Sequence, residues 1–164
     1  MSVRDEILSA NERYASGFGK GELAMPPARQ FAVVTCMDAR LDPARFLGLE
    51  EGDAHVIRNA GGLVGDDAMR SLVISHWLLG TRQAFVIAHT DCGMLTFTNQ
   101  QLQAKLADEA GADASAIDFL PFSDLDESVR ASLRRISESP LLPGSFTASG
   151  FVYDVKSGRL REIA

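Results

Sequence analysis

The sequence of 164 residues predicts an α/β fold: a central parallel β-sheet flanked by helices, with an N-terminal helix and a C-terminal β-hairpin. Three short, nearly all-apolar runs, 31–36, 54–59 and 83–89, are rich in β-branched or aromatic residues. Runs of this kind are typical of strands covered on both faces of a parallel sheet. The segments between them have helical character, so the order β-α-β-α-β predicts right-handed crossover connections.

The first segment of the chain is expected to be an amphipathic helix. In residues 4–18, apolar side chains recur at near-helical spacing, and Gly17 and Gly19 end the pattern. The connector that follows contains the pair Pro26 and Pro27, which excludes a helix. Such a helix could pack on its own chain or on a neighbouring one, and the sequence leaves that choice open.

Both segments between the expected strands carry signals for helix ends. Residues 42–49 open with Asp42, a good N-cap residue, and with Pro43 at the first helical position. Residues 66–80 open with an acidic pair, which suits the positive end of a helix dipole, and close on Gly80. These signals predict two crossover helices.

Two further helices and a hairpin are expected beyond the third strand. Residues 96–115 have a helical pattern with a frayed end, and residues 123–139 form a second amphipathic helix. Alternation over 146–164, interrupted by a turn at 156–158, predicts a β-hairpin.

Length and composition are those of one globular domain. The hydrophobic fraction of 46% and the charged fraction of 23% are ordinary for such a domain. The chain is also long enough to bury a core without disulfides. We therefore expect a single domain over 1–164, made of a helical arm and connector (1–27), a core that carries the site (28–98), and helices with the hairpin (99–164).

The charge balance argues against several classes of partner. A formal net charge of -6 offers no basic patch to nucleic acid and no attraction to an anionic membrane surface. No apolar run approaches the roughly 20 residues needed to cross a bilayer. The charged N-terminus has no secretory signal pattern, so we expect a cytoplasmic protein. A phosphate-binding loop motif for nucleotides is absent from the sequence.

Chemically active residues directly follow two of the expected strands. Cys36, Asp38 and Arg40 leave the end of the first strand, whereas His89 and Cys92 leave the end of the third. Because the carboxyl ends of parallel strands meet at one edge of a sheet, we expect the two thiols, the imidazole and the carboxylate to reach one point. Sulfur together with imidazole nitrogen favours Zn²⁺ over magnesium or calcium.

Other interpretations of these residues stay open. The cysteines could be unrelated core thiols beside a capping histidine, or one thiol could be a nucleophile paired with His89. Two thiols near one histidine fit a metal better. Asp91 fits a turn or a helix cap better than a metal ligand, and Arg58 fits a structural partner for a carboxylate or a carbonyl.

Three segments together resemble a known family. "CMDAR" (36–40), "RNAGG" (58–62) and "HTDCG" (89–93) occur in this order and at suitable separations. The combination is similar to the pattern of the β-class carbonic anhydrases, in particular their short bacterial and archaeal branch. The similarity runs from about residue 28 to residue 98. The branch also includes members that resemble hydrolases of carbonyl sulfide or carbon disulfide.

The resemblance implies Zn²⁺ as the cofactor, held by Cys36, His89 and Cys92, with Asp38 or water in the fourth position. Arg40 can pair with the Asp38 carboxylate and hold it off the metal, which opens the position that a catalytic zinc needs. Asp38 and Arg40 are therefore the expected catalytic pair. The displaced Asp38 would accept the hydrogen of the nucleophile and orient it.

The implied activity is the reversible hydration of carbon dioxide to bicarbonate by a zinc-bound hydroxide, since zinc lowers the pKa of bound water to about 7. The alternative is hydrolysis of carbonyl sulfide or carbon disulfide to hydrogen sulfide and carbon dioxide at the same zinc site, which the motifs cannot separate from hydration. A third reading is a non-catalytic zinc domain in which Asp38 stays bound; it leaves Arg40 without a use.

A small neutral substrate needs a small, dry pocket. Ala60, Gly61 and Gly62 could supply it, because glycines let the backbone come close. The same stretch could simply be a strand-to-helix turn that needs positive φ. The family pattern further implies a homodimer or a higher homo-oligomer, with the cleft near the subunit interface and the N-terminal helix on the neighbouring subunit.

Overall fold

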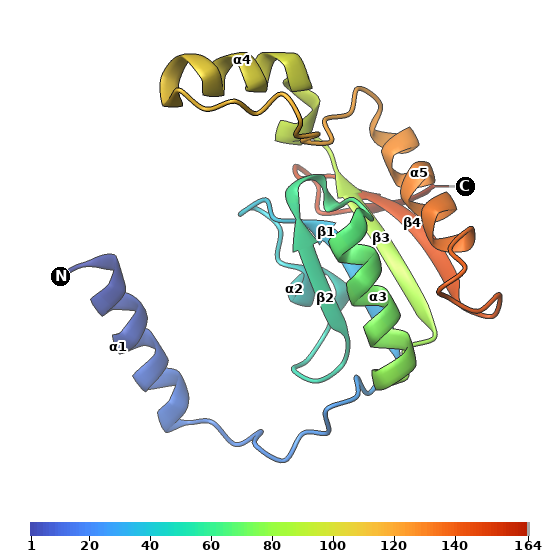
Figure 1. Ribbon diagram of the computed structural model, residues 1–164. Coiled ribbons are helices and arrows are strands. Elements are labelled where there is room, and N and C mark those ends of the chain that lie inside the picture. Colours follow the sequence, from blue (N-terminus) through green and yellow to red (C-terminus); the bar gives the residue numbers. More distant parts are fainter. Residues whose placement is uncertain (164) are drawn as a thin grey trace.

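The computed structural model describes residues 1–163 and contains a five-stranded sheet with the strand order β2-β1-β3-β4-β5 (Figure 1). The strands are β1 Phe31–Cys36, β2 His55–Asn59, β3 Gln83–His89, β4 Thr147–Tyr153 and β5 Leu160–Ile163. The pairs β1 with β2, β1 with β3, and β3 with β4 are parallel, and β4 with β5 is antiparallel. The predicted parallel sheet and C-terminal hairpin are thus confirmed, although Ala164, which the prediction included, lies outside the described residues.

The helices are α1 Val3–Ser16, α2 Pro43–Leu47, α3 Asp66–Leu79, α4 Asn99–Ala110 and α5 Leu125–Ser137, with short 3-10 turns at η1 Ala60–Gly62 and η2 Gly93–Leu95. In Figure 1, α3 and α5 lie over one face of the sheet and α2 lies behind it. None of the helices within residues 1–163 combines the length and the apolar character that crossing a bilayer requires.

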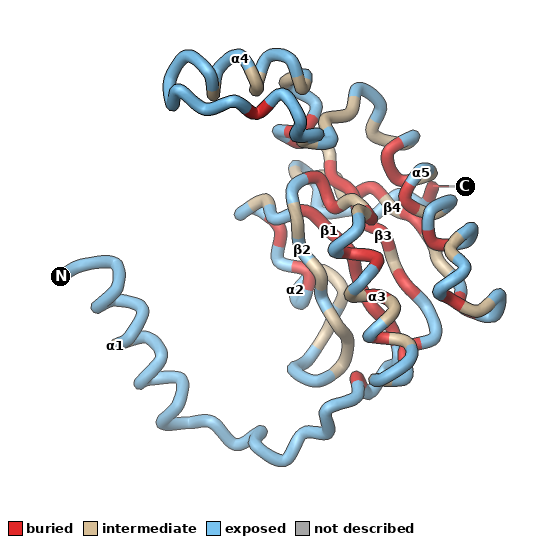
Figure 2. The backbone as a smooth tube through the Cα atoms, in the orientation of Figure 1, coloured by how far each residue is buried: buried red, intermediate tan, exposed pale blue. Residues whose placement is uncertain are grey.

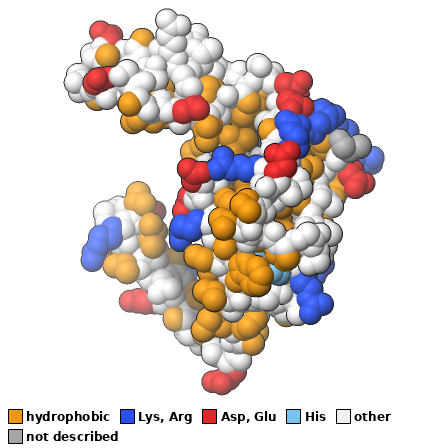
Figure 3. Space-filling model, turned by 45° about the vertical axis from the view of Figure 1, so that its right-hand side comes forward, with side chains coloured by type: hydrophobic (Ala, Val, Ile, Leu, Met, Phe, Trp, Pro, Cys, Tyr) orange, Lys and Arg blue, Asp and Glu red, His pale blue; other side chains and the backbone are white. Residues whose placement is uncertain are grey.

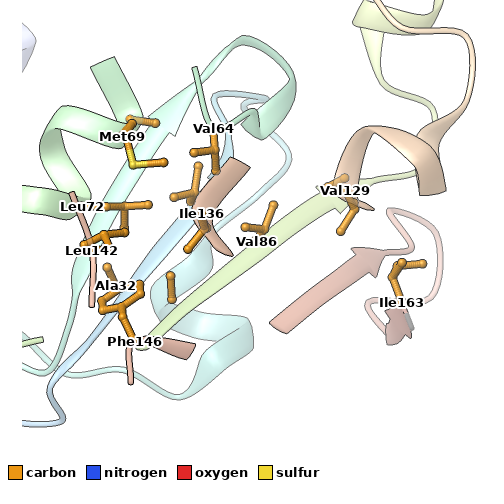
Figure 4. Close-up of a cluster of buried hydrophobic side chains, with 14 of the residues drawn as sticks. Ala32, Val64, Met69, Leu72, Val86, Val129, Ile136, Leu142, Phe146 and Ile163 are labelled. Carbon is orange, nitrogen blue, oxygen red and sulfur yellow. The ribbon is translucent and has the colours of Figure 1, made fainter. Parts of the chain in front are cut away.

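Alternate residues of the central strands fill two separate hydrophobic clusters. Ala32 and Val34 of β1 face the larger cluster, which also holds Leu72 of α3 and Ile136 of α5 (Figure 4). Phe31 and Val33 face the other side of the sheet, where α2 contributes partly buried side chains. All six residues of β1 are buried, as expected for a strand covered on both faces.

The prediction of full burial was wrong for β2. This strand lies at the edge of the sheet and pairs with β1 alone. Its side chains alternate between half-buried and exposed, and Val56 is 41% exposed. The apolar run predicted a strand correctly, but its place in the strand order decided how much of it is covered.

The ends of the crossover helices follow local chemistry. Asp42 caps α2 through a hydrogen bond from the backbone N–H of Arg45, and Gly80 ends α3 in a left-handed conformation, as predicted. The acidic pair Asp66 and Asp67 occupies the first turn of α3. These carboxylates therefore meet the positive end of the helix dipole there.

The N-terminal arm, residues 1–27, extends away from the sheet (Figures 1 and 2). Its helix α1 ends at Gly17, as predicted, and none of its residues is buried. Near the sheet, the Tyr14 hydroxyl donates a hydrogen bond to Glu51, and Lys20 pairs with the same carboxylate at 2.7 Å. The apolar side chains of α1 thus do not dock on the same chain.

Candidate metal centre

The two cysteines and the histidine gather where β1 and β3 end. Cys36 is the last residue of β1, His89 is the last of β3, and Cys92 lies in the turn that follows. Their ligand atoms all lie within 4.8 Å of one another, and all three residues are buried. The parallel pairing of β1 with β3 produces this meeting point, because it puts both carboxyl ends at the same edge.

The His89 side chain is arranged as a ligand would be. Its Nδ1 donates a hydrogen bond to the Thr90 carbonyl at 2.9 Å, so that Nε2 is the nitrogen free to bind a metal when the ring is neutral. That Nε2 is buried and has no hydrogen-bond partner within the described part of the chain. Burying an unsatisfied polar atom is costly, so this atom fits a metal ion among the neighbouring thiols.

The two thiols differ in acidity. Burial raises the pKa of Cys36, but the His89 imidazole and the backbone N–H groups of Asp38 and Gly61 outweigh it and bring that pKa down to about 7. Burial and the neighbouring Cys36 raise the pKa of Cys92 to about 11, against the backbone N–H of Met94. A second thiolate beside the first therefore needs a cation, and the donor set fits a divalent one.

Asp38 lies beside this group and is held by Arg40. The Arg40 Nε and Nη2 donate to Asp38 Oδ1 and Oδ2 at 3.0 and 2.8 Å, and the backbone N–H of Arg40 donates to Oδ1 at 2.9 Å. These bonds hold the pKa of Asp38 well below its usual range. Asp38 Oδ2 is 3.8 Å from His89 Nε2, so the carboxylate stays near the group while both of its oxygens bind Arg40.

The sequence did not reveal a second partner of Arg40. Asp91 lies in the turn between His89 and Cys92, as expected for a turn residue, but its carboxylate accepts a hydrogen bond from Arg40 Nη1 at 2.7 Å. The Asp91 carbonyl accepts another from Nη2 at 2.9 Å. The available signal was an acidic residue between two candidate ligands, opposite an arginine at the same sheet edge.

Arg58 secures the loop after β1. From the neighbouring strand β2, its Nε donates to the Cys36 carbonyl at 3.0 Å and its Nη2 donates to the Asp38 carbonyl at 2.7 Å. This is the structural role, as a partner of carbonyl groups, that the sequence favoured for Arg58. The two hydrogen bonds fix the backbone that carries the Cys36 and Asp38 side chains.

The glycines of the "RNAGG" segment form a tight turn against β1. Gly61 and Gly62 have φ of 84° and 66°, so the alternative of a turn that needs positive φ describes the backbone. A Cβ on Gly62 would lie 2.8 Å from the backbone nitrogen of Cys36. Ala60 lines a cavity of about 270 Å³ together with Phe119 and Leu120. A role of this segment in binding substrate stays a prediction.

Comparison with known proteins gives a consistent family. The family model described as carbonic anhydrase matches residues 31–160. The chain is 50% identical over 165 residues to β-carbonic anhydrase 1 of Mycobacterium tuberculosis, which covers 99% of both sequences. It is 34% identical to the carbon disulfide hydrolase of Acidianus sp. (strain A1-3), over 96% of this chain and 87% of that protein.

Solved structures agree with the sequence relatives. The carbonic anhydrase of Streptococcus mutans superposes with a TM-score of 0.96 at 48% identity, covering 100% of this chain and 99% of that one. The apo form of a carbon disulfide hydrolase superposes with a TM-score of 0.74 at 32% identity, covering 97% of this chain and 89% of that one.

Proposed function

We propose that this chain, which belongs to the β-carbonic anhydrase family, catalyses the reversible hydration of carbon dioxide to bicarbonate. The observation that carries the proposal is the buried Cys36–His89–Cys92 group beside a carboxylate that Arg40 holds. Identity of 50% to a β-carbonic anhydrase, against 34% to a carbon disulfide hydrolase, favours hydration over the alternative.

Cys36, His89 and Cys92 would hold the zinc ion. Two sulfur donors and one nitrogen donor form a set that favours zinc over magnesium and calcium. The Nε2 of His89, which has no hydrogen-bond partner among residues 1–163, supports this assignment. When bound, zinc supplies a Lewis acid that brings the pKa of a coordinated water to about 7, so that a hydroxide nucleophile is available near neutral pH.

Asp38 would act as the acceptor that orients the nucleophile. Its pKa lies well below the usual range because of Arg40, so at neutral pH it accepts hydrogen bonds and does not donate them. Both of its oxygens already bind Arg40, which keeps the carboxylate out of the ligand set and leaves a fourth position for water. Arg40 keeps its charge, because Asp38 and Asp91 raise its pKa further.

The charge of the group would favour a neutral substrate. Two thiolates would balance the charge of the zinc ion, and Arg40 balances Asp38, so the hydroxide nucleophile would leave the centre with a net negative charge, which disfavours an anionic substrate and assists release of an anionic product. Carbon dioxide and bicarbonate fit these two requirements. Carbonyl sulfide and carbon disulfide are also small and neutral, so charge does not separate the two candidate reactions.

The second candidate is hydrolysis of carbon disulfide or carbonyl sulfide at the same centre, which the relatives named carbon disulfide hydrolase support. A non-catalytic zinc domain is the third and weakest candidate. It requires Asp38 to stay on the metal, and the bidentate pairing of Asp38 with Arg40 argues against that.

The test is an assay of the three substrates side by side on one preparation with one zinc per chain. We expect carbon dioxide hydration to exceed the buffer rate by orders of magnitude and sulfide release to be slow, while protein stripped of metal by a chelator does neither. Rapid sulfide release with negligible hydration would replace the proposal by the second candidate. Inactivity with every substrate despite stoichiometric zinc would leave the third.

We also infer a homodimer or a higher homo-oligomer. Apolar side chains of the arm stay exposed along α1 and just after it (Figure 3). They are Val3, Ile7, Leu8, Tyr14 and Phe18, each at least 48% exposed. A second copy of the chain could cover both these side chains and the edge strand β2. It would then supply the apolar contacts that α1 lacks on its own chain.

A further inference from the structure

The Arg40 guanidinium is shared between two carboxylates from different parts of the chain. Its Nε and Nη2 donate to Asp38, on the loop after β1, at 3.0 and 2.8 Å. Its Nη1 donates to the Asp91 carboxylate at 2.7 Å, and Nη2 donates to the Asp91 carbonyl at 2.9 Å. Arg40 therefore joins the loop that follows Cys36 to the turn that carries Cys92.

The pair with Asp38 alone would hold Arg40 weakly. The Arg40 side chain is 47% exposed, and a long guanidinium side chain in solvent loses much of its pairing energy to screening and to rotamer freedom. The Asp91 carboxylate and carbonyl add two further bonds on the other side of the guanidinium. Together they fix the plane of the guanidinium, which a bidentate pair requires.

Backbone conformation does not explain an aspartate at position 91. Asp91 has φ of 57°, which glycine and asparagine also adopt readily. Its side chain is 74% exposed, so packing does not explain it either. Arg40 lowers the pKa of the Asp91 carboxylate most, the positive charge of Lys156 also lowers it, and the negative charge of Asp38 raises it. The contact with Arg40 is what distinguishes the carboxylate from an amide.

We propose that Asp91 is a positioning residue: by holding Arg40, it keeps Asp38 paired with Arg40 and out of the Cys36–His89–Cys92 ligand set. The proposal rests on the proposed function, because it concerns access of water to the fourth position of that metal centre. Asp38 has two competing partners, the metal and Arg40, and anything that loosens Arg40 favours the metal.

The test compares Asp91→Asn with the parent and with Asp67→Asn. Asparagine keeps the backbone conformation and removes the charge. Asp67 is the matched control, since it is an exposed aspartate, 82% exposed, that pairs with Arg70 in α3. Two quantities are measured across pH: kcat/KM for hydration by the zinc protein, and the visible absorption of the cobalt-substituted protein, which reports whether a carboxylate is bound.

We expect kcat/KM of Asp91→Asn to fall roughly tenfold near neutral pH, the equivalent of one lost charge-assisted hydrogen bond. The deficit should shrink as pH rises, because hydroxide then displaces the carboxylate, and the midpoint of the cobalt spectral change should move to higher pH. Asp67→Asn should match the parent in both measurements. Asp91→Gly, which relaxes the backbone and also lacks the carboxylate, should behave like Asp91→Asn and serves if that variant folds poorly.

Unchanged profiles in the Asp91 variants would overturn the proposal, and so would a loss of rate that is equal at every pH with an unshifted cobalt spectrum. The cobalt spectrum does not depend on the substrate. A parent that fails to hydrate carbon dioxide would therefore refute the proposed function, while a shifted midpoint in Asp91→Asn would still support the role of Asp91.

Discussion

The metal centre and the N-terminal arm differ in how far their own chain buries them. Cys36, His89 and Cys92 are 5%, 0% and 3% exposed, and their surroundings come from strands and loops of the same chain. In α1 no residue is buried, although the helix has a capping box at Ser2. The ligand residues of the metal centre are thus buried by their own chain. Helix α1 is formed and capped, but its apolar side chains are exposed to solvent.

The difference separates local from tertiary determinants of structure. A helix of 14 residues is marginal in water on its own, so caps and spacing alone do not account for a stable arm. The centre, in contrast, depends on strand pairing between residues some 50 positions apart along the chain, as with Thr35 and Ile87. Substitutions in the metal centre should therefore leave α1 unaffected, and substitutions in α1 should leave the metal centre intact.

The largest effect is expected at the centre itself. Cys92→Ser removes one soft ligand of the proposed set, so zinc should be lost and hydration should drop at least about a thousandfold, since no other residue would supply the missing metal chemistry. Metal analysis of the purified protein and stopped-flow hydration measure both. Stoichiometric zinc with the rate of the parent would show that Cys92 is a core thiol.

A large loss of stability is expected for Gly62→Ala in the turn beside the centre. Its Cβ would lie 2.8 Å from the backbone nitrogen of Cys36, and φ of 66° is strained for alanine. We expect about 2–4 kcal/mol of destabilisation in denaturant unfolding. Gly19→Ala in the arm is the matched control, because no atom of residues 1–163 lies within 4 Å of its Cβ. Equal destabilisation by the two substitutions would contradict the conclusion that the turn beside the centre is tightly packed and the arm is not.

An intermediate effect on activity is expected for Arg40→Ala. The substitution frees Asp38 to bind the metal, so hydration should fall about 10- to 100-fold while zinc stays bound. Arg70→Ala, which breaks a salt bridge of similar length in α3, is the control and should leave the rate unchanged. Activity of Arg40→Ala equal to that of the parent would refute the role of Arg40 in holding Asp38.

Charge on the apolar side of α1 should break the oligomer and spare the centre. Val3 and Ile7 lie one turn apart on the helix, so changing both to Asp puts two charges on a surface that we propose to be buried between subunits. Light scattering should show monomers that still bind one zinc each. Asn11→Asp, an exposed polar position, should remain oligomeric. An unchanged mass for the double variant would exclude this surface as the interface.

A smaller effect concerns protons. Because the pKa of Cys36 is about 7 and that of Cys92 is about 11, the metal-free thiols are partly protonated at neutral pH. Zinc requires both as thiolates, so binding at pH 7 should release at least one proton per zinc, and affinity should rise with pH. Calorimetry in buffers of different ionisation enthalpy counts these protons. Release of less than one proton per zinc at pH 7 would contradict the assignment of the thiols as ligands.

Most of the fold could be predicted from local signals. Apolar runs predicted the strands, and caps such as Asp42 and Gly80 predicted where helices end. The burial of β2 could not be predicted, because it depends on which strand occupies the edge of the sheet. The packing of α1 could not be predicted either, since nothing in the helix itself specifies what covers it.

For the site, too, one part could be predicted from the sequence and another part could not. The parallel order of β1 and β3 predicted that Cys36, His89 and Cys92 meet, because strand ends of a parallel sheet share an edge. The contact of Asp91 with Arg40 escaped prediction, since it depends on how the turn before Cys92 folds back over the loop after β1. The meeting of strand ends follows from the parallel order of the strands. A contact between two loops depends on the path that each loop takes, which the sequence pattern does not reveal.

The most direct test of the proposed zinc centre is a titration of the metal-free chain with zinc, with carbon dioxide hydration followed by stopped flow. The rate should rise linearly and level off at one zinc per chain, and Cys92→Ser should stay at the buffer rate throughout. A parent chain that has taken up one zinc and still hydrates carbon dioxide no faster than buffer would contradict the assignment.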